Sequence, residues 1–205
     1  MLFRSGVARS YSFATPAQPN AQVSFFVRQV PQGVFSGHVH TQPLVGQRVS
    51  VQGPAGDFWL RPGEGPLLCV AGGSGLAPLL ALLQGALDSG VQRPVRLVFG
   101  ARTQADLYAL DEIAALAQAW PLPFDFVPVL SQEPEGSDWP GARGLVTLAL
   151  GARPEPATQA YLCGPPAMVD AVEAHLVAQG VARADIHADR FTTLHDQPAA
   201  PSRAA

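Results

Sequence analysis

The stretch from Pro66 to Pro78, PLLCVAGGSGLAP, constrains the fold of this chain more than any other segment. Its five apolar residues, 67–71, are typical of a parallel strand that is buried on both faces. The turn that follows consists of Gly72, Gly73, Ser74 and Gly75. Such small residues let backbone amides and a helix N-terminus approach an anion such as a pyrophosphate. Because Pro78 suits the first turn of a helix, the stretch predicts a strand, a glycine turn and a helix that bind a nucleotide.

Two other interpretations of this turn stay open. Glycine turns after strands are often purely structural, and Gly73-x-Gly75-x-x-Pro78 departs from the G-x-G-x-x-G dinucleotide fingerprint at its last position. Ser74 also lies on a strand-to-helix turn, as the nucleophile of a serine hydrolase does. That elbow needs G-x-S-x-G, whereas Leu76 occupies the last glycine position, so a serine hydrolase is the least favoured alternative.

The composition narrows the class of protein. With 205 residues, of which 47% are hydrophobic and 14% charged, the chain can form one large or two small domains with a sizeable core. The net charge of -3 gives no broad cationic surface, so we expect neither nucleic acid nor an anionic membrane as the main partner. All 13 basic residues are arginine. Walker-type phosphate binding and Schiff-base chemistry, which need a lysine, are therefore excluded.

Targeting, disulfide and metal signals are weak. No apolar run approaches the roughly 20 residues that span a bilayer, and the first ten residues lack a signal-peptide core, so we expect a cytoplasmic location. Cys69 and Cys163 are the only thiols, which argues against a disulfide framework and excludes a four-thiolate iron–sulfur site within the chain. His38 and His40 have no third ligand at suitable spacing, so no metal site is expected.

The second part of the chain alternates strands and helices. Apolar runs predict strands at 67–71, 95–99, 124–130 and 160–163, with another apolar segment at 145–150. Helical spacing marks helices after three of these strands, the second including Leu107 and Leu110. This order predicts an α/β nucleotide-binding domain with a Rossmann-like parallel sheet, whose ligands bind at the carboxyl ends of the strands.

The first part of the chain is different. Alternating polar and apolar residues predict strands at 9–14, 22–30 and 48–52, and a short helix near 33–40 with Ser36 as its cap. We therefore expect an incomplete antiparallel β-barrel at 1–62, the α/β domain at 63–194 and a flexible tail at 195–205.

Four short motifs carry a resemblance to a known family. They are Arg9-x-Tyr11-Ser12, Gly33-x-x-Ser36, Gly53-Pro54-x-Gly56-x-Phe58 and, beyond the glycine turn, Cys163-Gly164-Pro165-x-x-Met168. In this order they resemble the ferredoxin–NADP reductase superfamily, and most of all the NADH-dependent flavin reductase components of bacterial ring-hydroxylating oxygenases and multicomponent monooxygenases.

The resemblance implies a bound FAD. It assigns the flavin diphosphate to Arg9, stacking on the isoalloxazine to Tyr11, and a hydrogen bond at the flavin N5 and O4 edge to Ser12. It also implies that the second motif holds the pyrophosphate by backbone amides and a hydroxyl; its residues are Gly33, Val34, Phe35 and Ser36. An aromatic ring near the flavin face is implied at Phe191.

The resemblance also implies bound NADH. The glycine turn and the last motif would bind it through Gly72, Gly73, Ser74, Gly75, Pro78, Cys163, Gly164, Pro165 and Met168. Cys163 would lie beside the nicotinamide C4, so Ser12 and Cys163 are the implied catalytic residues. Arg102 follows a strand end on the adenosine side; a contact with a 2′-phosphate would allow NADPH, but a single arginine favours NADH.

The implied activity is an NAD(P)H-dependent flavoprotein reductase that passes electrons through FAD to an iron–sulfur protein or oxygenase component. Barrels of this superfamily normally have three strands before the R-x-Y-S strand, whereas only eight residues precede Arg9. We favour a misassigned start over a partner that supplies the strands or a degraded remnant. The alternative function is accordingly a nucleotide-binding remnant or interaction module without catalytic activity.

Overall fold

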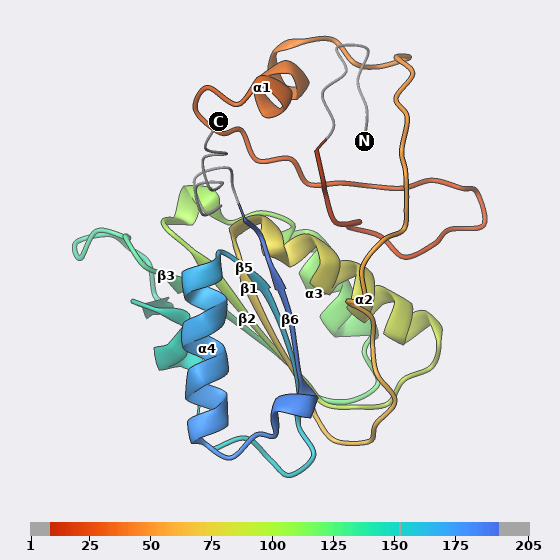
Figure 1. Ribbon diagram of the computed structural model, residues 1–205. Helices are drawn as coiled ribbons and strands as arrows, with labels where there is room; N and C mark the ends of the chain where they lie inside the picture. Colours follow the sequence, from red (N-terminus) through yellow and green to blue (C-terminus); the bar gives the residue numbers. More distant parts are fainter. Residues whose placement is uncertain (1–8, 152, 193–205) are drawn as a thin grey trace, which may run out of the picture.

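The computed structural model describes residues 9–151 and 153–192 (Figure 1). The expected tail at 195–205 lies outside these residues. Six parallel strands form one sheet in the order β4-β3-β2-β1-β5-β6. Their bounds are β1 Leu67–Gly72, β2 Val95–Ala101, β3 Phe124–Leu130, β4 Ala142–Arg143, β5 Gln159–Gly164 and β6 Ile186–Arg190. The order reverses between β1 and β5, and ligands of open α/β sheets bind at such a point.

Helices cover both faces of the sheet (Figure 1). On one face, α2 (Leu76–Asp88) and α3 (Leu110–Ala119) pack against a core that includes Leu97 and Phe99. On the other face, α4 (Pro166–Ala178) and the 3-10 turn η3 (Val146–Ala149) enclose a second core around Val98 and Leu162. The pairings confirm the expected parallel sheet. The apolar runs predicted it because a parallel strand is covered by helices on both faces.

Three local features of this half differ from the expectation. Helix α3 begins at Leu110 rather than Leu107, because residues Gln104–Asp106 form a separate 3-10 turn, η2, closed by a capping box between Thr103 and Asp106. The apolar segment 145–150 contains the turn η3. Strands β4 and β6 were not expected; one has only two residues, and the other carries polar side chains.

The front segment, residues 9–60, differs from the expectation in its strands. The expected strands at 9–14, 22–30 and 48–52 are extended but form no ladder; among the described residues only an isolated bridge at Ser50 is assigned. A backbone hydrogen bond of 2.8 Å from Ala14 N to Ser24 O joins the first two. Alternating polar and apolar residues indicate a segment that can form a strand, but a strand also needs a neighbouring strand to pair with, and the described residues provide too few.

The short helix of the front segment forms as expected, but its cap differs. Helix α1 spans Val34–Thr41 and has Gly33 as its N-cap without a side-chain hydrogen bond. The Ser36 hydroxyl instead accepts a hydrogen bond of 3.1 Å from Val30 N, so Ser36 fixes the approach to the helix rather than capping it.

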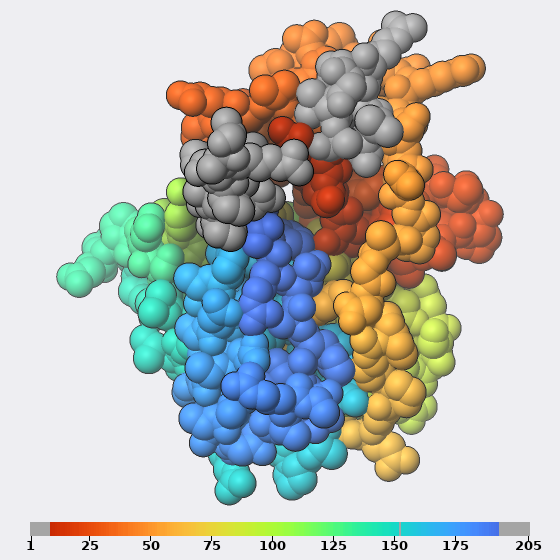
Figure 2. Space-filling model, in the orientation of Figure 1, coloured from red at the N-terminus to blue at the C-terminus, as the bar shows by residue number. Residues whose placement is uncertain are grey.

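Two aromatic contacts are among those that pack the front segment against the nucleotide half. Phe26 meets Tyr108 edge-on, with ring centroids 5.0 Å apart, and Phe58 meets Tyr161 at 6.0 Å. The Tyr161 hydroxyl accepts a 2.7 Å hydrogen bond from Arg61 N. Figure 2 shows the front residues, red to orange, gathered above the blue C-terminal strand and helix. These contacts bring the front segment to the end of the sheet at which the strands terminate.

Candidate functional site

The two nucleotide motifs of the sequence meet where β1 and β5 end side by side. Ala71 pairs with Cys163 in the parallel register. A Cβ added to Gly72 would lie 2.5 Å from Met168 Sδ and 2.9 Å from Pro165 Cδ. Gly164 has φ +150°, and a Cβ added to it would lie 3.0 Å from backbone atoms of Gly72. Both glycines are therefore required by close packing between the motifs.

Gly73 has a different reason to be glycine. Its φ is +53°, and an added Cβ would meet only one described atom within 4 Å, Arg28 Nη1 at 3.6 Å. The Tyr108 hydroxyl donates a 2.9 Å hydrogen bond to the Gly73 carbonyl and holds the turn in place. Helix α2 follows with Gly75 as its N-cap and no side-chain cap. The N-terminus of α2 therefore lacks a side-chain cap and lies beside the open side of Gly73, an arrangement that suits a pyrophosphate.

Cys163 lies just below this turn. Its side chain is fully buried, and an added Cβ on Gly75 would overlap the Cys163 carbonyl. Burial, and then the nearby Asp189 carboxylate, raise the pKa of the Cys163 thiol above its usual range. The thiol is therefore protonated at neutral pH and contributes shape rather than a nucleophile.

Asp189 is a site residue that the sequence analysis missed. It lies on β6, paired with Cys163 on β5. Burial and then the charge of Asp57 raise its pKa, whereas a hydrogen bond from the Ser12 side chain lowers it. Ser12, Cys163 and Asp189 therefore meet, although Ser12 belongs to the front segment. A carboxylate two residues before an aromatic residue, in Asp189-Arg190-Phe191, was the available signal.

Phe191 follows at the end of β6. Its backbone N donates a 2.8 Å hydrogen bond to the Gly164 carbonyl, and its ring packs on the core that contains Cys163. The last nucleotide motif and the implied flavin-facing aromatic residue are thus tied together.

The flavin motifs of the front segment also meet. Tyr11 and Phe35 lie with ring centroids 5.1 Å apart. Burial raises the pKa of the Tyr11 phenol, and the charge of Arg9 partly offsets this, so Arg9 is close to the phenol. Arg9, Tyr11 and the start of α1 therefore form one group, as a flavin site built from both motifs requires.

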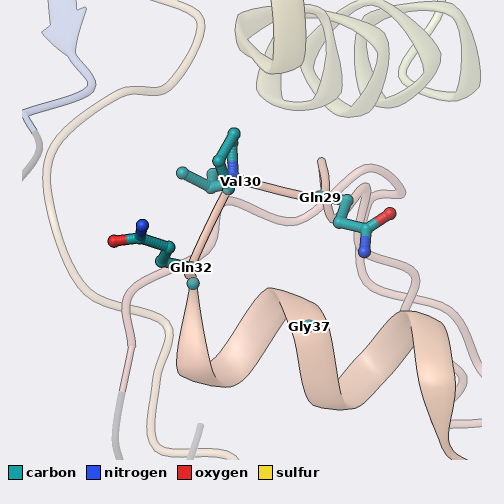
Figure 3. A pocket seen from close by; sticks show the side chains of 6 residues that line it. Gln29, Val30, Gln32 and Gly37 are labelled. Atoms are coloured by element: carbon teal, nitrogen blue, oxygen red, sulfur yellow. The ribbon is translucent and has the colours of Figure 1, made fainter.

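A hollow of about 410 Å³ adjoins the start of α1 (Figure 3). It is lined by Gln29, Val30, Pro31, Gln32, Gly33 and Gly37. Figure 3 shows the side chains of Gln29 and Gln32 on opposite sides of Val30, above the helix. Of the second flavin motif, Val34 is exposed, whereas Phe35 and Ser36 are buried. Gly33 N already donates a 2.9 Å hydrogen bond to the Val30 carbonyl, so the part of this motif that a diphosphate can reach is the exposed Val34, and the two buried side chains support it.

Arg102 lies at the end of β2, on the other side of the glycine turn. Its Nη2 is 3.4 Å from Asp106 Oδ1. Burial raises the pKa of Asp106, but hydrogen bonds from Thr103 and the charge of Arg102 together hold it below its usual value. Asp106 is therefore ionised at neutral pH and neutralises the arginine that was considered for a 2′-phosphate.

Two further observations concern the alternatives. Ser74 lies in the 3-10 turn η1 (Gly73–Gly75), and among the described residues no histidine hydrogen-bonds it. The serine-hydrolase alternative thus finds no support.

Of the helices in residues 9–151 and 153–192, none has the length and apolar character that a bilayer crossing demands.

The sheet with its glycine turn, and the grouped flavin motifs beside it, have the arrangement of a flavin-binding domain followed by a nicotinamide-nucleotide-binding domain. The sequence profile of the oxidoreductase NAD-binding domain matches residues 69–174, and that of the oxidoreductase FAD-binding domain matches residues 2–59. The chain therefore belongs to the family of ferredoxin–NADP reductase-like oxidoreductases, as its motifs predicted.

Individual relatives agree with this assignment. The xylene/toluene monooxygenase electron transfer component XylA of Pseudomonas putida is 48% identical over 187 residues, which cover 89% of this chain and 53% of the relative. The propane 2-monooxygenase reductase component of Mycolicibacterium goodii is 40% identical, over 92% of this chain and 56% of its own. The crystal structure of the Amycolatopsis cytochrome P450 reductase GcoB superposes with a TM-score of 0.77 at 35% identity, over 93% of this chain and 58% of that one. The chain thus spans about half the length of the curated relatives it matches.

Proposed function

We propose that this chain is the FAD- and NADH-binding part of an NAD(P)H-dependent flavoprotein reductase that passes electrons to an iron–sulfur protein or an oxygenase component. The observation that carries the proposal is the meeting of the front segment with the nucleotide end of the sheet, where Phe26 packs on Tyr108 and Arg28 Nη1 lies over the Gly73 turn. The names of the relatives, which are electron transfer or reductase components of monooxygenases, support the same function.

In this proposal the glycine turn binds the dinucleotide pyrophosphate. The amides at the start of α2 supply hydrogen bonds, and the bare Gly73 backbone permits close approach. Gly164 and Pro165 form the facing wall, which Met168 supports by its packing against Gly72. Asp106 pairs with Arg102, the arginine considered for a 2′-phosphate, which favours NADH over NADPH.

The flavin is held from the front segment. Arg9 supplies a guanidinium to the diphosphate, together with the backbone of Val34 at the start of α1. Tyr11, fixed against Phe35, offers a flat face for the isoalloxazine.

When bound, the two cofactors supply the redox chemistry, in which a hydride passes from the nicotinamide C4 to the flavin N5. The chain supplies orientation, which must hold the reacting atoms roughly 3 to 3.5 Å apart. Cys163 limits how deeply the nicotinamide can sit, because its buried thiol forms a rigid floor. Phe191 closes the site from the end of β6.

Ser12 would hydrogen-bond the flavin N5 and O4 edge. Asp189, whose pKa is raised by burial and by the charge of Asp57, lies close to Ser12. We also infer a cytoplasmic location, where NADH is available.

Flavin absorbance tests the proposal. The purified chain is incubated with FAD, freed of unbound FAD and mixed with NADH in the absence of oxygen. We expect a yellow protein whose flavin absorbance NADH bleaches, and a slower bleaching in Cys163→Ala. A chain that retains no FAD, or retains FAD that NADH leaves oxidised, would contradict the proposal and favour the non-catalytic alternative.

A further inference from the structure

The linker between the front segment and the sheet, residues 61–66, is held by a side chain at the edge where the strands begin. Figure 1 shows the chain passing beside the sheet to this edge before it enters β1. There Gln159 Nε2 donates a 3.0 Å hydrogen bond to the Pro62 carbonyl, and Gln159 N donates one of 3.0 Å to the Pro66 carbonyl. Gln159 is buried and starts β5, the strand that carries Cys163 near its other end. No motif of the sequence includes it.

A buried arginine holds both Gln159 and the linker. Arg93 is only 3% exposed, and its Nη1 donates a 3.0 Å hydrogen bond to Gln159 Oε1. Its Nε donates to the Gly65 carbonyl of the linker. The Arg93 carbonyl in turn accepts a 2.8 Å hydrogen bond from Trp120 Nε1, at the end of α3. Because a guanidinium leaves water at a cost unless it is hydrogen-bonded, these contacts fix the arginine and the groups that it meets.

Tyr161 extends the same contacts along β5. Its hydroxyl accepts a 2.7 Å hydrogen bond from Arg61 N and donates one of 3.4 Å to Gln159 Oε1. Its fully buried ring meets Phe58 of the front segment edge-on. Cys163 lies two residues further along the strand. One strand therefore contacts the linker and the front segment at its start and carries a residue of the nicotinamide site at its end.

The linker also fits closely against the chain that leads into β5. A Cβ added to Gly65 would lie 2.1 Å from the Ala157 carbonyl oxygen, and one added to Gly63 would lie 3.0 Å from Gln159 Nε2. Domains that a linker joins move relative to each other by default. The contacts of this linker restrict such movement at the point where it would begin.

We propose that Gln159, together with Arg93 and Tyr161, is a positioning residue for hydride transfer. These three side chains, the linker network, fix the linker and thereby the angle at which the front segment meets the sheet. The inference rests on the proposed function, because it takes the front segment as the flavin site and the end of β5 as the nicotinamide site. Since a misplacement of about 1 Å between reacting atoms slows a reaction about a hundredfold, contacts that set the angle affect the rate constant without touching either cofactor.

Two variants break the linker network by a few atoms each. Gln159→Glu keeps an acceptor for Arg93 but at neutral pH loses the donor to the Pro62 carbonyl. Tyr161→Phe keeps the buried ring but loses the hydroxyl that accepts from Arg61 N. In both variants we expect hydrogen–deuterium exchange of the linker peptide, read by mass spectrometry, to become about tenfold faster, whereas β2 and β3 keep wild-type protection.

Anaerobic single turnover of the FAD-loaded protein with saturating NADH tests the positioning role. The rate constant of flavin bleaching should fall about tenfold in both variants, with an unchanged Kd for ADP-ribose in calorimetric titration. A role in stability alone would lower the amplitude of bleaching but leave its rate constant unchanged, because the folded molecules would still react normally. Arg183→Ala, which removes an exposed arginine from its ion pair with Glu173 on α4, is the control and should change neither exchange nor rate.

The outcomes separate the inference from the proposed function. Wild-type exchange of the linker in both variants would overturn the linker network. Faster exchange with a wild-type rate constant would overturn the positioning role alone, and either variant decides this where the other does not fold. A wild type that holds no FAD, or whose FAD NADH leaves oxidised, would overturn the proposed function and with it the positioning role.

Discussion

The front segment and the nucleotide half use similar residues in opposite ways. Among the described residues of the front segment only Ala14 and Phe35 are buried hydrophobic residues, whereas the nucleotide half encloses two apolar cores. Val45 in the first is 101% exposed, and Val98 in the second is 0% exposed. The difference teaches that an alternating or apolar pattern becomes a strand only where neighbouring strands can pair with it and cover it.

Charge separates the two regions as well. Residues 1–62 contain five arginines and one carboxylate, Asp57, whereas residues 63–205 contain eight arginines and fifteen carboxylates. The basic region therefore carries the groups suited to phosphates, and the acidic region presents mainly backbone amides to them. The proposed site lies where the two regions meet, and it needs both.

A glycine substitution in each region tests the difference most strongly. Gly75→Ala places a Cβ against the Cys163 carbonyl and within 2.8 Å of Gly164 N, which only backbone movement can relieve, so we expect a loss of about 3 kcal/mol in the free energy of unfolding. Gly37→Ala in α1 meets nothing within 4 Å and should gain about 0.8 kcal/mol from helix propensity. Urea unfolding followed by circular dichroism measures both, and a Gly75→Ala protein as stable as the wild type would refute the close packing.

A pair of valines gives the next largest effect. Val98→Ala deletes two buried methyl groups from the sheet, which should cost about 2 kcal/mol. Val45→Ala removes the same atoms from solvent and should change the unfolding free energy by less than about 0.5 kcal/mol. Equal losses in the two variants would show that the front segment buries Val45 in solution.

Tyr108→Phe tests the contact between the regions. The substitution keeps the ring against Phe26 but removes the hydroxyl that donates to the Gly73 carbonyl, and we expect a loss of about 1 kcal/mol. Thermal unfolding measures it. An unchanged melting temperature would mean that the hydroxyl does not hold the glycine turn.

The smallest effect concerns pH. The pKa of Asp189 is raised in the folded chain, so the folded state binds more protons than the unfolded state between the ordinary pKa and the raised one. Stability from this group is therefore present at low pH and is lost as the pH rises through that window. Asp189→Asn should remove this decline, which urea midpoints from about pH 4 to about pH 7 would reveal. Parallel curves for variant and wild type would contradict the raised pKa.

The sequence predicted the nucleotide half well, because the strands at 67–72, 95–101 and 124–130 consist mainly of apolar residues. Strand β6 was missed since it carries His187 and Asp189 among smaller residues. The front strands were wrong because pairing depends on neighbours that local alternation does not specify.

The sequence predicted the motif residues of the site but not the residues that reach it from elsewhere. The short motifs named the residues that the structure brings together at the glycine turn and at Tyr11 and Phe35. Asp189 and Arg28 were missed, because their importance comes from contacts with Ser12 and Gly73, which lie far away in the sequence. Such pairings follow from the packing of one region on the other.

Stereospecific labelling of NADH tests most directly whether the two regions form a single redox site. A nicotinamide held between the glycine turn and the front segment presents one face to the flavin, so deuterium at only one of the two C4 positions should slow the anaerobic bleaching of the bound FAD. Equal rates with both labels, or slowing by either label alike, would show that no shared site orients the two rings.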